Sequence, residues 1–264
     1  LTLNQESLAE CLYQGRWWNP FPKFRFSERP DTAAAQVLEG NIIILVDNSP
    51  AAMILPSSVF DIIEEADDYY FPPVTGTYLR LSRMVISILT LLLTPTWLML
   101  MQNPHLLPPW LEFLKLSEAP HVPLVFQLFI LEFAIDGLRL AAINTPSMLT
   151  TPLSVIAGIV LGEYSVKSGW FNMQSLLYMA FVSIANYSQP SYELGYALKF
   201  LRVLLLVLTL LFNLWGFLAG LVLIFLLMIL NKTISGKSYL YPLIPFNGKK
   251  LKRKLIRTRL HVKY

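Results

Sequence analysis

The sequence predicts an α-helical multi-pass membrane bundle of about six membrane-crossing or re-entrant helices, preceded by the end of a small soluble α/β domain. The 264 residues are 55% hydrophobic and only 14% charged, well below the roughly 25% charge of soluble domains. Long apolar runs follow residue 79, whereas turn formers and most acidic residues precede it. We therefore expect a cytosolic domain over residues 1–79, a transmembrane domain over 80–232 and a basic cytosolic tail over 233–264.

Residues 1–79 contain the elements expected of the soluble domain. The segment "RPDTAAAQVLEG" predicts a short helix that Asp31 caps and Gly40 ends. The segments "NIIILVD" and "AAMILP" predict two β-strands joined through "NSP", and "SSVFDIIEEADDYY" predicts a second helix opened by a serine. A strand pair flanked by helices indicates the end of an α/β domain. Because Leu1 begins in the middle of such sequence, we expect further protein upstream.

The second region contains apolar segments that are suited to membrane-spanning helices. They are residues 84–101, 123–144, 148–166, 171–187 and 196–231. The last segment is too long for one crossing at 1.5 Å per residue, and "FNLWG" offers a turn in its middle, so we expect a helical hairpin. In the proline-rich loop after the first segment, Trp110 to Leu116 is expected to lie at the membrane interface.

Positive charges in short loops test this topology, because they gather on the cytosolic side. Six crossings place one group of cations on the same side as the basic tail, against Lys115 and Lys167 opposite. That group is Arg80, Arg83, Arg139, Lys199 and Arg202. In a four-span alternative, residues 123–144 do not cross and 196–231 cross once, which moves the last three of these cations outside. The six-span topology fits better.

The segment "ILEFAIDGLRLAAINTP" places charges inside an apolar helix. Glu132, Asp136 and Arg139 follow at spacings of four and three, so they lie within about 60° of one another on the helix. Each charge at the bilayer centre costs roughly 2.5–3.5 kcal/mol, whereas each Leu, Ile, Phe or Val returns roughly 0.3–0.6 kcal/mol. The helix is therefore marginal in lipid alone, and its polar stripe needs protein or water around it.

Three interpretations of this stripe stay open. In the first, Asp136 and Arg139 pair one turn apart and Glu132 finds a donor on a neighbouring helix, so that the charges hold the bundle together. In the second, the stripe faces a water-filled path, and Glu132 or Asp136 forms an acidic ring that attracts cations in a symmetric assembly. In the third, the helix lies flat in the interface with its charges among the headgroups.

Two other groups of charges are candidate sites. Glu163 follows "GIVLG" near the end of its span, where it is either an ordinary interfacial carboxylate or part of a pore mouth. The last sixteen residues hold eight Lys and Arg and no acid, which favours a membrane-surface anchor over a docking site or a nucleic-acid contact. The anchor is assigned to Lys249, Lys250, Lys252, Arg253, Lys254, Arg257 and Arg259.

The sequence predicts no catalytic residues, no metal site and no cofactor. The single cysteine, Cys11, and three histidines far apart in the chain do not match zinc-type spacings. No phosphate-binding glycine loop and no nucleophile with a plausible base is visible. We therefore expect that the protein is not an enzyme.

Several motifs resemble a known family. The segment "ERPDTAAAQVLEGNIIILVDNSPAAMILP" resembles the signature of the A subunits of GerA-type spore germinant receptors, in which an ERPD segment precedes an "LEG…VDxSP…P" strand pair. "ADDYY" and "LLLTPTW" continue this pattern, and the resemblance covers essentially the whole chain.

Within the family, "GTYLRLSR", "DGLRLAAINTP" and "PSYELGYALKFLR" look most like the stage V sporulation members. The central motif of receptor A subunits is nearer "FEALREAGVRLP". Here Asp136 and Arg139 match that motif, whereas Leu140 and Asn144 replace its second acid and its later arginine. This departure favours the sporulation members over a nutrient receptor.

The resemblance implies a multi-pass protein of the spore inner membrane in endospore-forming bacteria, with its N-terminal domain and C-terminal tail in the cytosol. Residues 1–79 would be the end of a larger N-terminal domain. It also implies a homo-oligomeric ring, expected to be a pentamer. The expected partners are a second small membrane protein, other germination receptor subunits and membrane lipids, but not nucleic acid.

From the charged stripe and the resemblance together, we expect a subunit of an oligomeric ion channel that releases monovalent cations in spore germination. The alternative is a non-conducting membrane scaffold that organises germination receptor proteins.

Overall fold

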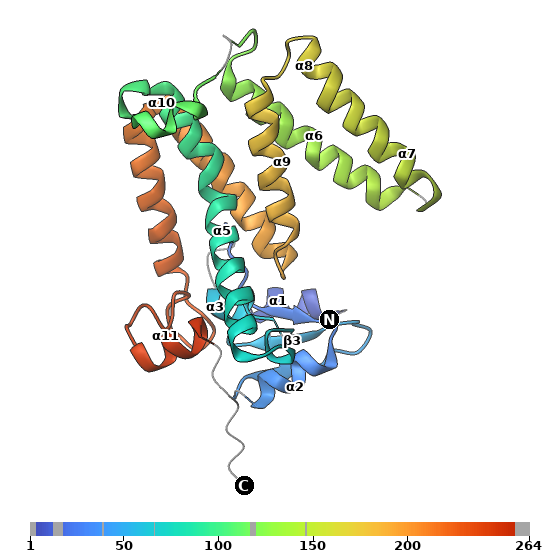
Figure 1. The fold of residues 1–264 in the computed structure, drawn as a ribbon. Coiled ribbons are helices and arrows are strands. Elements are labelled where there is room, and N and C mark those ends of the chain that lie inside the picture. Colours follow the sequence, from blue (N-terminus) through green and yellow to red (C-terminus); the bar gives the residue numbers. More distant parts are fainter. Residues whose placement is uncertain are drawn as a thin grey trace. The chain divides into compact units, whose positions relative to one another are not determined.

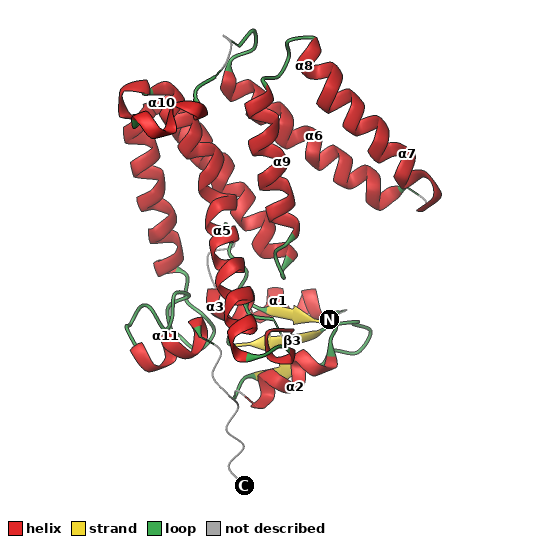
Figure 2. Cartoon of the chain, viewed as in Figure 1, coloured by secondary structure: helices red, strands yellow, loops and turns green. Residues whose placement is uncertain are grey.

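A computed structural model describes residues 4–12, 18–38, 40–65, 67–116, 120–145 and 147–256 (Figure 1). The described residues are mostly helical, with one small sheet (Figure 2). They form two compact units, and each unit combines segments that are separated in the sequence. Unit 1 comprises Leu1–Ile88, Ser188–Phe200 and Val222–Tyr264, and unit 2 comprises Leu89–Tyr187 and Leu201–Leu221. The predicted division into three consecutive segments stays a prediction.

Unit 1 is built on an antiparallel sheet of short strands in the order β1-β3-β2. They are β1 (Arg25–Ser27), β2 (Ile42–Ile44) and β3 (Ala52–Leu55). β2 and β3 confirm the predicted strand pair. β1 was not predicted, because its residues Arg-Phe-Ser form no apolar run like those of β2 and β3. Met53 and Leu55 of β3 pack with Phe24 and with Ala9 of α1 (Gln5–Leu12) to form the core of this domain.

The first predicted helix of the soluble domain forms as α2 (Pro30–Leu38), but Asp31 lies inside it rather than at its cap. Proline takes the first helical position, where its fixed φ and its missing N–H cost nothing. The Asp31 carboxylate accepts hydrogen bonds from the Thr32 amide at 2.7 Å and from the Arg29 side chain. Gly40, which follows this helix, has a φ of +91° that favours glycine.

The second predicted helix is two short helices, α3 (Val59–Ile63) and α4 (Asp67–Tyr70). Ser58 opens α3 with a capping box, because it and Asp61 exchange side-chain to backbone hydrogen bonds. The chain leaves the helical conformation at Glu64, whose ψ is 140°. The prediction of one continuous helix is therefore wrong at this residue, and the contacts of Glu64 described below give the reason.

Three further helices contribute to unit 1. They are the start of α5 (Pro73–Gln102), both ends of α10 (Tyr192–Leu230) and α11 (Gly248–Leu255). The loop between α10 and α11 folds back on the end of α10, since the Tyr239 amide donates to the carbonyl of Asn231 at 2.9 Å. The Tyr239 carbonyl in turn accepts from the Val59 amide at 3.1 Å, which joins this loop to α3.

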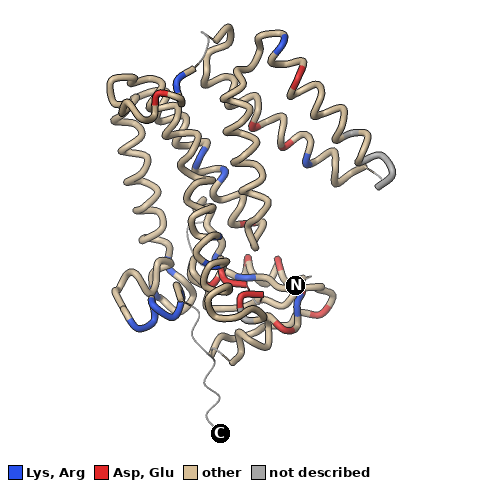
Figure 3. Tube along the Cα trace, viewed as in Figure 1, with Lys and Arg blue, Asp and Glu red and all other residues tan. Residues whose placement is uncertain are grey.

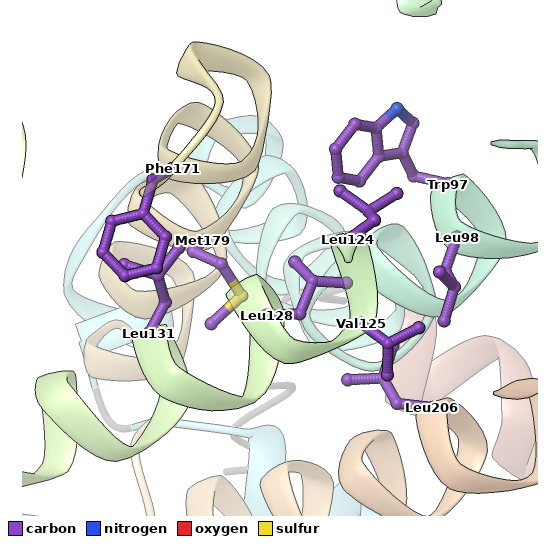
Figure 4. Close-up of a cluster of buried hydrophobic side chains, with 9 residues drawn as sticks. All are labelled: Trp97, Leu98, Leu124, Val125, Leu128, Leu131, Phe171, Met179 and Leu206. Carbon is purple, nitrogen blue, oxygen red and sulfur yellow. The ribbon is translucent and has the colours of Figure 1, made fainter. Parts of the chain in front are cut away.

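Unit 2 is helical and contains the apolar segments predicted in the middle of the chain. After the 3₁₀ turns Pro104–Leu106 and Pro109–Leu114, the helices are α6 (Leu124–Asn144), α7 (Ser147–Ala157), a π-helix (Gly158–Tyr164), α8 (Ser165–Lys167) and α9 (Met173–Tyr187). Their core gathers large apolar side chains from α5, α6, α9 and α10 (Figure 4). Leu128 and Leu206 at its centre are fully buried.

The long helix α10 is a hairpin, as predicted from "FNLWG". Asn213 has φ 54° and ψ −133°, which ends one helical arm and begins the next. A Cβ added at Gly216 would lie 1.9 Å from the Leu208 carbonyl oxygen, and one at Gly220 would lie 2.6 Å from a Leu205 methyl group. The two arms therefore pack in direct contact, and glycine permits this approach.

Two helices among the described residues, α5 and α10, are long and apolar enough to cross a membrane by length and composition alone. α6 has 21 residues and a similar apolar character, but Glu132, Asp136 and Arg139 all lie within it. The six-crossing topology stays a prediction.

Candidate functional site

The charged stripe of α6 meets a cation of α10 in unit 2. The Nε of Arg202 lies 2.6 Å from Oε1 of Glu132, and the two side chains are 3% and 7% exposed. The Nη1 of Arg202 also donates to the carbonyl oxygen of Thr90 in α5 at 2.9 Å. One guanidinium therefore joins three helices, and it compensates the Glu132 carboxylate where water has no access.

The stripe continues along α6 toward its C-terminal end, where it is less buried. Asp136 and Arg139 are half-buried, and the Arg139 guanidinium lies 5.4 Å from the ring centroid of Tyr187 in α9. This distance permits a cation–π interaction. The structure therefore places Glu132 in a buried ion pair across helices, as in the first interpretation, whereas the role of Asp136 stays a prediction.

One face of α6 beside Asp136 is exposed in the single chain. The exposed residues recur at helical spacing, so they share one side of the helix. They are Phe126, Ile130, Phe133, Gly137 and Leu140. Phe133, which is 83% exposed, precedes Asp136 by three residues, and Leu140 follows it by four. Asp136 therefore lies at the edge of an apolar surface that is exposed among the described residues.

Amide side chains make further polar contacts inside unit 2. Gln127 of α6 is fully buried, and its Oε1 accepts from Ser175 Oγ at 2.8 Å and from the Asn172 amide at 2.9 Å. Asn103, next to the end of α5, donates its amide to the side chain of Asn213 at the turn of the hairpin. These contacts link the start of α9 to α6, and the end of α5 to the turn of the α10 hairpin.

A second group of charges lies in unit 1 and is here called the Arg80 cluster. It consists of Asp61, Glu64, Glu65, Asp68, Arg80, Arg83 and Lys254. Arg80 is 1% exposed; its Nη2 lies 2.6 Å from Glu64 and its Nε lies 3.4 Å from Asp68. Arg83 binds the same Asp68 carboxylate at 2.8 Å. The cluster therefore joins α3 and α4 to the first turns of α5 within unit 1.

The C-terminal end of α11 completes the Arg80 cluster. The Nη1 of Arg80 donates to the carbonyl oxygens of Arg253 and Lys254, both at 3.1 Å. The Nζ of Lys254 lies 2.7 Å from Asp61 and 2.8 Å from Glu64. These carbonyls end a helix, where their partial negative charge favours a cation. Glu64 turns out of α3 because it meets both Arg80 and Lys254.

The other predicted site residues lie at the surface. Glu163 is in the π-helix, where its exposed carboxylate meets Lys167 Nζ at 2.5 Å. Lys249, Lys250, Lys252 and Arg253 are exposed on α11, unlike Lys254. Figure 3 shows that positive charge is concentrated along this helix. Arg257 and Arg259 lie outside the described residues.

Sequence reasoning missed the buried roles of Arg80 and Arg202, because both were treated as loop charges that report topology. The sequence did contain a signal for Arg202. An arginine within "KFLRVLLL" and an acid within "ILEF" both have the cost of burying a charge in an apolar helix, and pairing the two charges lowers that cost. Among the residues that the structure describes, no group of three His, Cys, Asp or Glu side chains lies where it could share a metal ion.

Comparison with known proteins identifies the family. Residues 2–264 match the model of the Bacillus/Clostridium GerA spore germination protein. The chain is 37% identical to stage V sporulation protein AF of Bacillus subtilis over 258 residues, which is 98% of this chain and 52% of that protein. It is 30% identical to spore germination protein GerLA of Bacillus cereus over 94% of this chain and 51% of that protein.

A third relative is spore germination protein A1 of Bacillus subtilis, with 25% identity over 93% of this chain and 51% of that protein. The chain thus spans about half the length of the curated relatives it matches. No solved structure matches it. Since the family model covers nearly all of the sequence, the chain belongs to the GerA family of Bacillus and Clostridium spore germination proteins.

Proposed function

We propose that this germination protein is a subunit of an oligomeric ion channel that releases monovalent cations across the spore inner membrane. The observation that carries the proposal is the position of Asp136, a half-buried carboxylate at the edge of the exposed face of α6. An apolar face with an acid at its edge is what a helix needs in order to pack against a second subunit and present the acid to an aqueous path.

The buried pair of Glu132 and Arg202 sharpens this proposal. Glu132 supports the helix from within, because its carboxylate already meets a guanidinium at 2.6 Å. Asp136 lies one turn further along α6 and is the carboxylate that an acidic ring would use. A ring of Asp136 carboxylates would raise the local concentration of cations at the path and exclude anions.

The proposal includes six crossings, which are α5, α6, the α7–α8 segment, α9 and the two arms of α10. The arms have lengths that suit a bilayer, since the hairpin divides the 39 residues of α10 at Asn213. The expected assembly is a homo-oligomeric ring, with a pentamer as the leading possibility. A second small membrane protein and other germination receptor subunits are the proposed partners.

The test is ion flux through the full protein reconstituted in liposomes, with Asp136→Asn as the decisive variant. We expect a lower monovalent cation flux and weaker selectivity over chloride, with the oligomer intact by size-exclusion chromatography. Glu163→Gln is the matched control, because it also removes one carboxylate but at an exposed ion pair. Unchanged flux and selectivity in an assembled Asp136→Asn protein would overturn the proposed role of Asp136.

One observation favours the alternative, a membrane scaffold that organises germination receptor proteins without conducting ions. Glu132 is satisfied by Arg202 within a single chain, which is what a purely stabilising role requires. A scaffold predicts that the purified protein, even with its partner, gives no single-channel current. It also predicts that co-purification of receptor proteins fails when residues 1–79 are removed, whereas a channel retains its current in the full protein.

A further inference from the structure

The helix α11 has two faces of different character. Four cations share one side of the helix within about 160°, because successive residues turn by about 100°, and all four are exposed. They are Lys249, Lys250, Lys252 and Arg253. The remaining side, with Leu251, Lys254 and Leu255, is only partly exposed. α11 is therefore held by one side and presents positive charge on the other.

The position of α11 in unit 1 is fixed close to the first apolar turn of α5. Arg80 donates to the carbonyl oxygens at the end of α11 at 3.1 Å. The apolar stretch of α5 begins at Met84, four residues later, which is about 6 Å along a helix. Since α5 is one of the two helices suited to cross a membrane, α11 lies at the level where headgroups would begin.

Aromatic and apolar side chains lie beside the basic face. Phe246 is 75% exposed two residues before α11 begins, and Leu243 is 39% exposed in the same loop. The ring of Tyr241 lies close to two cations, with its centroid 4.9 Å from Lys237 Nζ and 5.5 Å from Lys250 Nζ. Exposed aromatic residues interleaved with lysine are typical of surfaces that rest at a membrane interface.

We propose that the exposed face of α11 binds the anionic headgroups of the membrane that α5 enters, with Phe246 inserted beside them. Charge complementarity favours anionic lipid, and each cation close to such a surface strengthens binding roughly fivefold. The apolar Phe246 and the closeness of α11 to the start of α5 favour lipid over nucleic acid, because binding to nucleic acid would require neither feature. Lys254 does not belong to this surface, because its ammonium group meets Asp61 and Glu64. The inference holds whether the protein conducts ions or not.

The experiment places a fluorescent reporter next to the basic face. The full chain with Cys11→Ser and Gly248→Cys, labelled with an environment-sensitive dye, is reconstituted in nanodiscs of phosphatidylcholine, with or without phosphatidylglycerol. Gly248 suits the label, because a Cβ there meets only the Phe246 ring, at 3.5 Å. We expect blue-shifted emission and quenching by headgroup nitroxides in the anionic discs, both reduced by high salt.

Two double variants separate this surface from general charge. Lys249→Gln with Lys252→Gln should strongly reduce the difference between the two lipids, whereas Lys115→Gln with Lys167→Gln removes two exposed cations elsewhere and should leave it intact. Soluble inorganic phosphate at matched ionic strength should not reverse the shift. Equal signals in both lipids, an unaffected Lys249/Lys252 variant, or reversal by phosphate or by an RNA oligonucleotide at matched ionic strength would each overturn the proposal. Size-exclusion profiles verify that every variant is folded.

Discussion

In unit 2 the guanidinium of Arg202 meets Glu132 among apolar helices, whereas in unit 1 the guanidinium of Arg80 meets Glu64 and Asp68 in a cluster of seven charged side chains. Both arginines are almost fully buried, at 3% and 1% exposure. Their surroundings differ, because the Arg80 cluster includes Lys254 and Glu65, which are 21% and 34% exposed and reach water.

This difference determines what each group can tolerate. A charge left without its partner among apolar side chains is cut off from water, so its desolvation is poorly compensated. In the Arg80 cluster, a lost charge can be replaced in part by a neighbour or by solvent. The same residue type should therefore be more sensitive to substitution in unit 2 than in unit 1.

The largest expected effect is that of Glu132→Gln, which leaves the Arg202 charge buried and should destabilise unit 2 by about 3–5 kcal/mol. The measurement is thermal unfolding of the detergent-solubilised protein. The double variant Glu132→Met with Arg202→Met should recover most of this loss, because it removes both charges together. A double variant as unstable as the single one would show that the pair is not the reason for the sensitivity.

Arg80→Gln should have the next largest effect, about 3 kcal/mol, and the effect should be local. Arg83 and Lys254 keep positive charge beside Asp68 and Glu64, but the carbonyls of α11 lose their donor. We expect faster hydrogen exchange in α11 and around α3, with exchange in α6 unchanged. If hydrogen exchange in α6 became faster to the same extent, the effect of Arg80 would not be confined to unit 1, and this prediction would be wrong.

Lys254→Gln should cost only about 1 kcal/mol, since this side chain is partly exposed and Arg80 still compensates Glu64. Limited proteolysis at α11 is a suitable measurement, because a loosened helix is cleaved sooner. Lys252→Gln is the matched control on the opposite face and should leave the cleavage rate unchanged. If Lys254→Gln lost more stability than Arg80→Gln, Lys254 rather than Arg80 would be the more important cation of the cluster.

The smallest effect is expected at the surface, where Arg29 and Tyr70 hydrogen-bond to Asp31 and hold its pKa well below the ordinary range. A lowered folded pKa means that the stabilisation is present above the ordinary pKa of about 4 and is lost as the pH falls through the folded value. Asp31→Asn should therefore lower the melting temperature slightly at neutral pH and not at all in strong acid. A difference that grew with acidity would contradict this sign.

Much of the fold could be predicted, because it depends on local patterns. The strand pair follows from two short apolar runs on either side of "NSP", and α6 begins and ends within one residue of its predicted bounds. The turn of the hairpin falls at Asn213, inside the predicted "FNLWG". In each of these cases, the residues that determine the structure are neighbours in the chain.

The rest could not be predicted, because it depends on which distant segments meet. Glu64 breaks a helical pattern in order to reach Lys254, which lies 190 residues away. Arg202 pairs with Glu132 only because α6 and α10 pack together, and no spacing within either segment specifies that neighbour. The stripe of α6 was identified as costly from its sequence, and a donor to Glu132 on a neighbouring helix was one open interpretation, but the sequence did not identify that donor as Arg202.

The contact of Arg80 with the end of α11 also bears on the order of assembly during synthesis. The carbonyls of Arg253 and Lys254 leave the ribosome 173 and 174 residues after Arg80, and all of unit 2 is made in between. Glu64 and Asp68 are available to Arg80 from the start, so the early part of unit 1 can fold around them while the chain continues. Docking of α11 is thus a late step that follows synthesis of the helices on which the proposed membrane function depends.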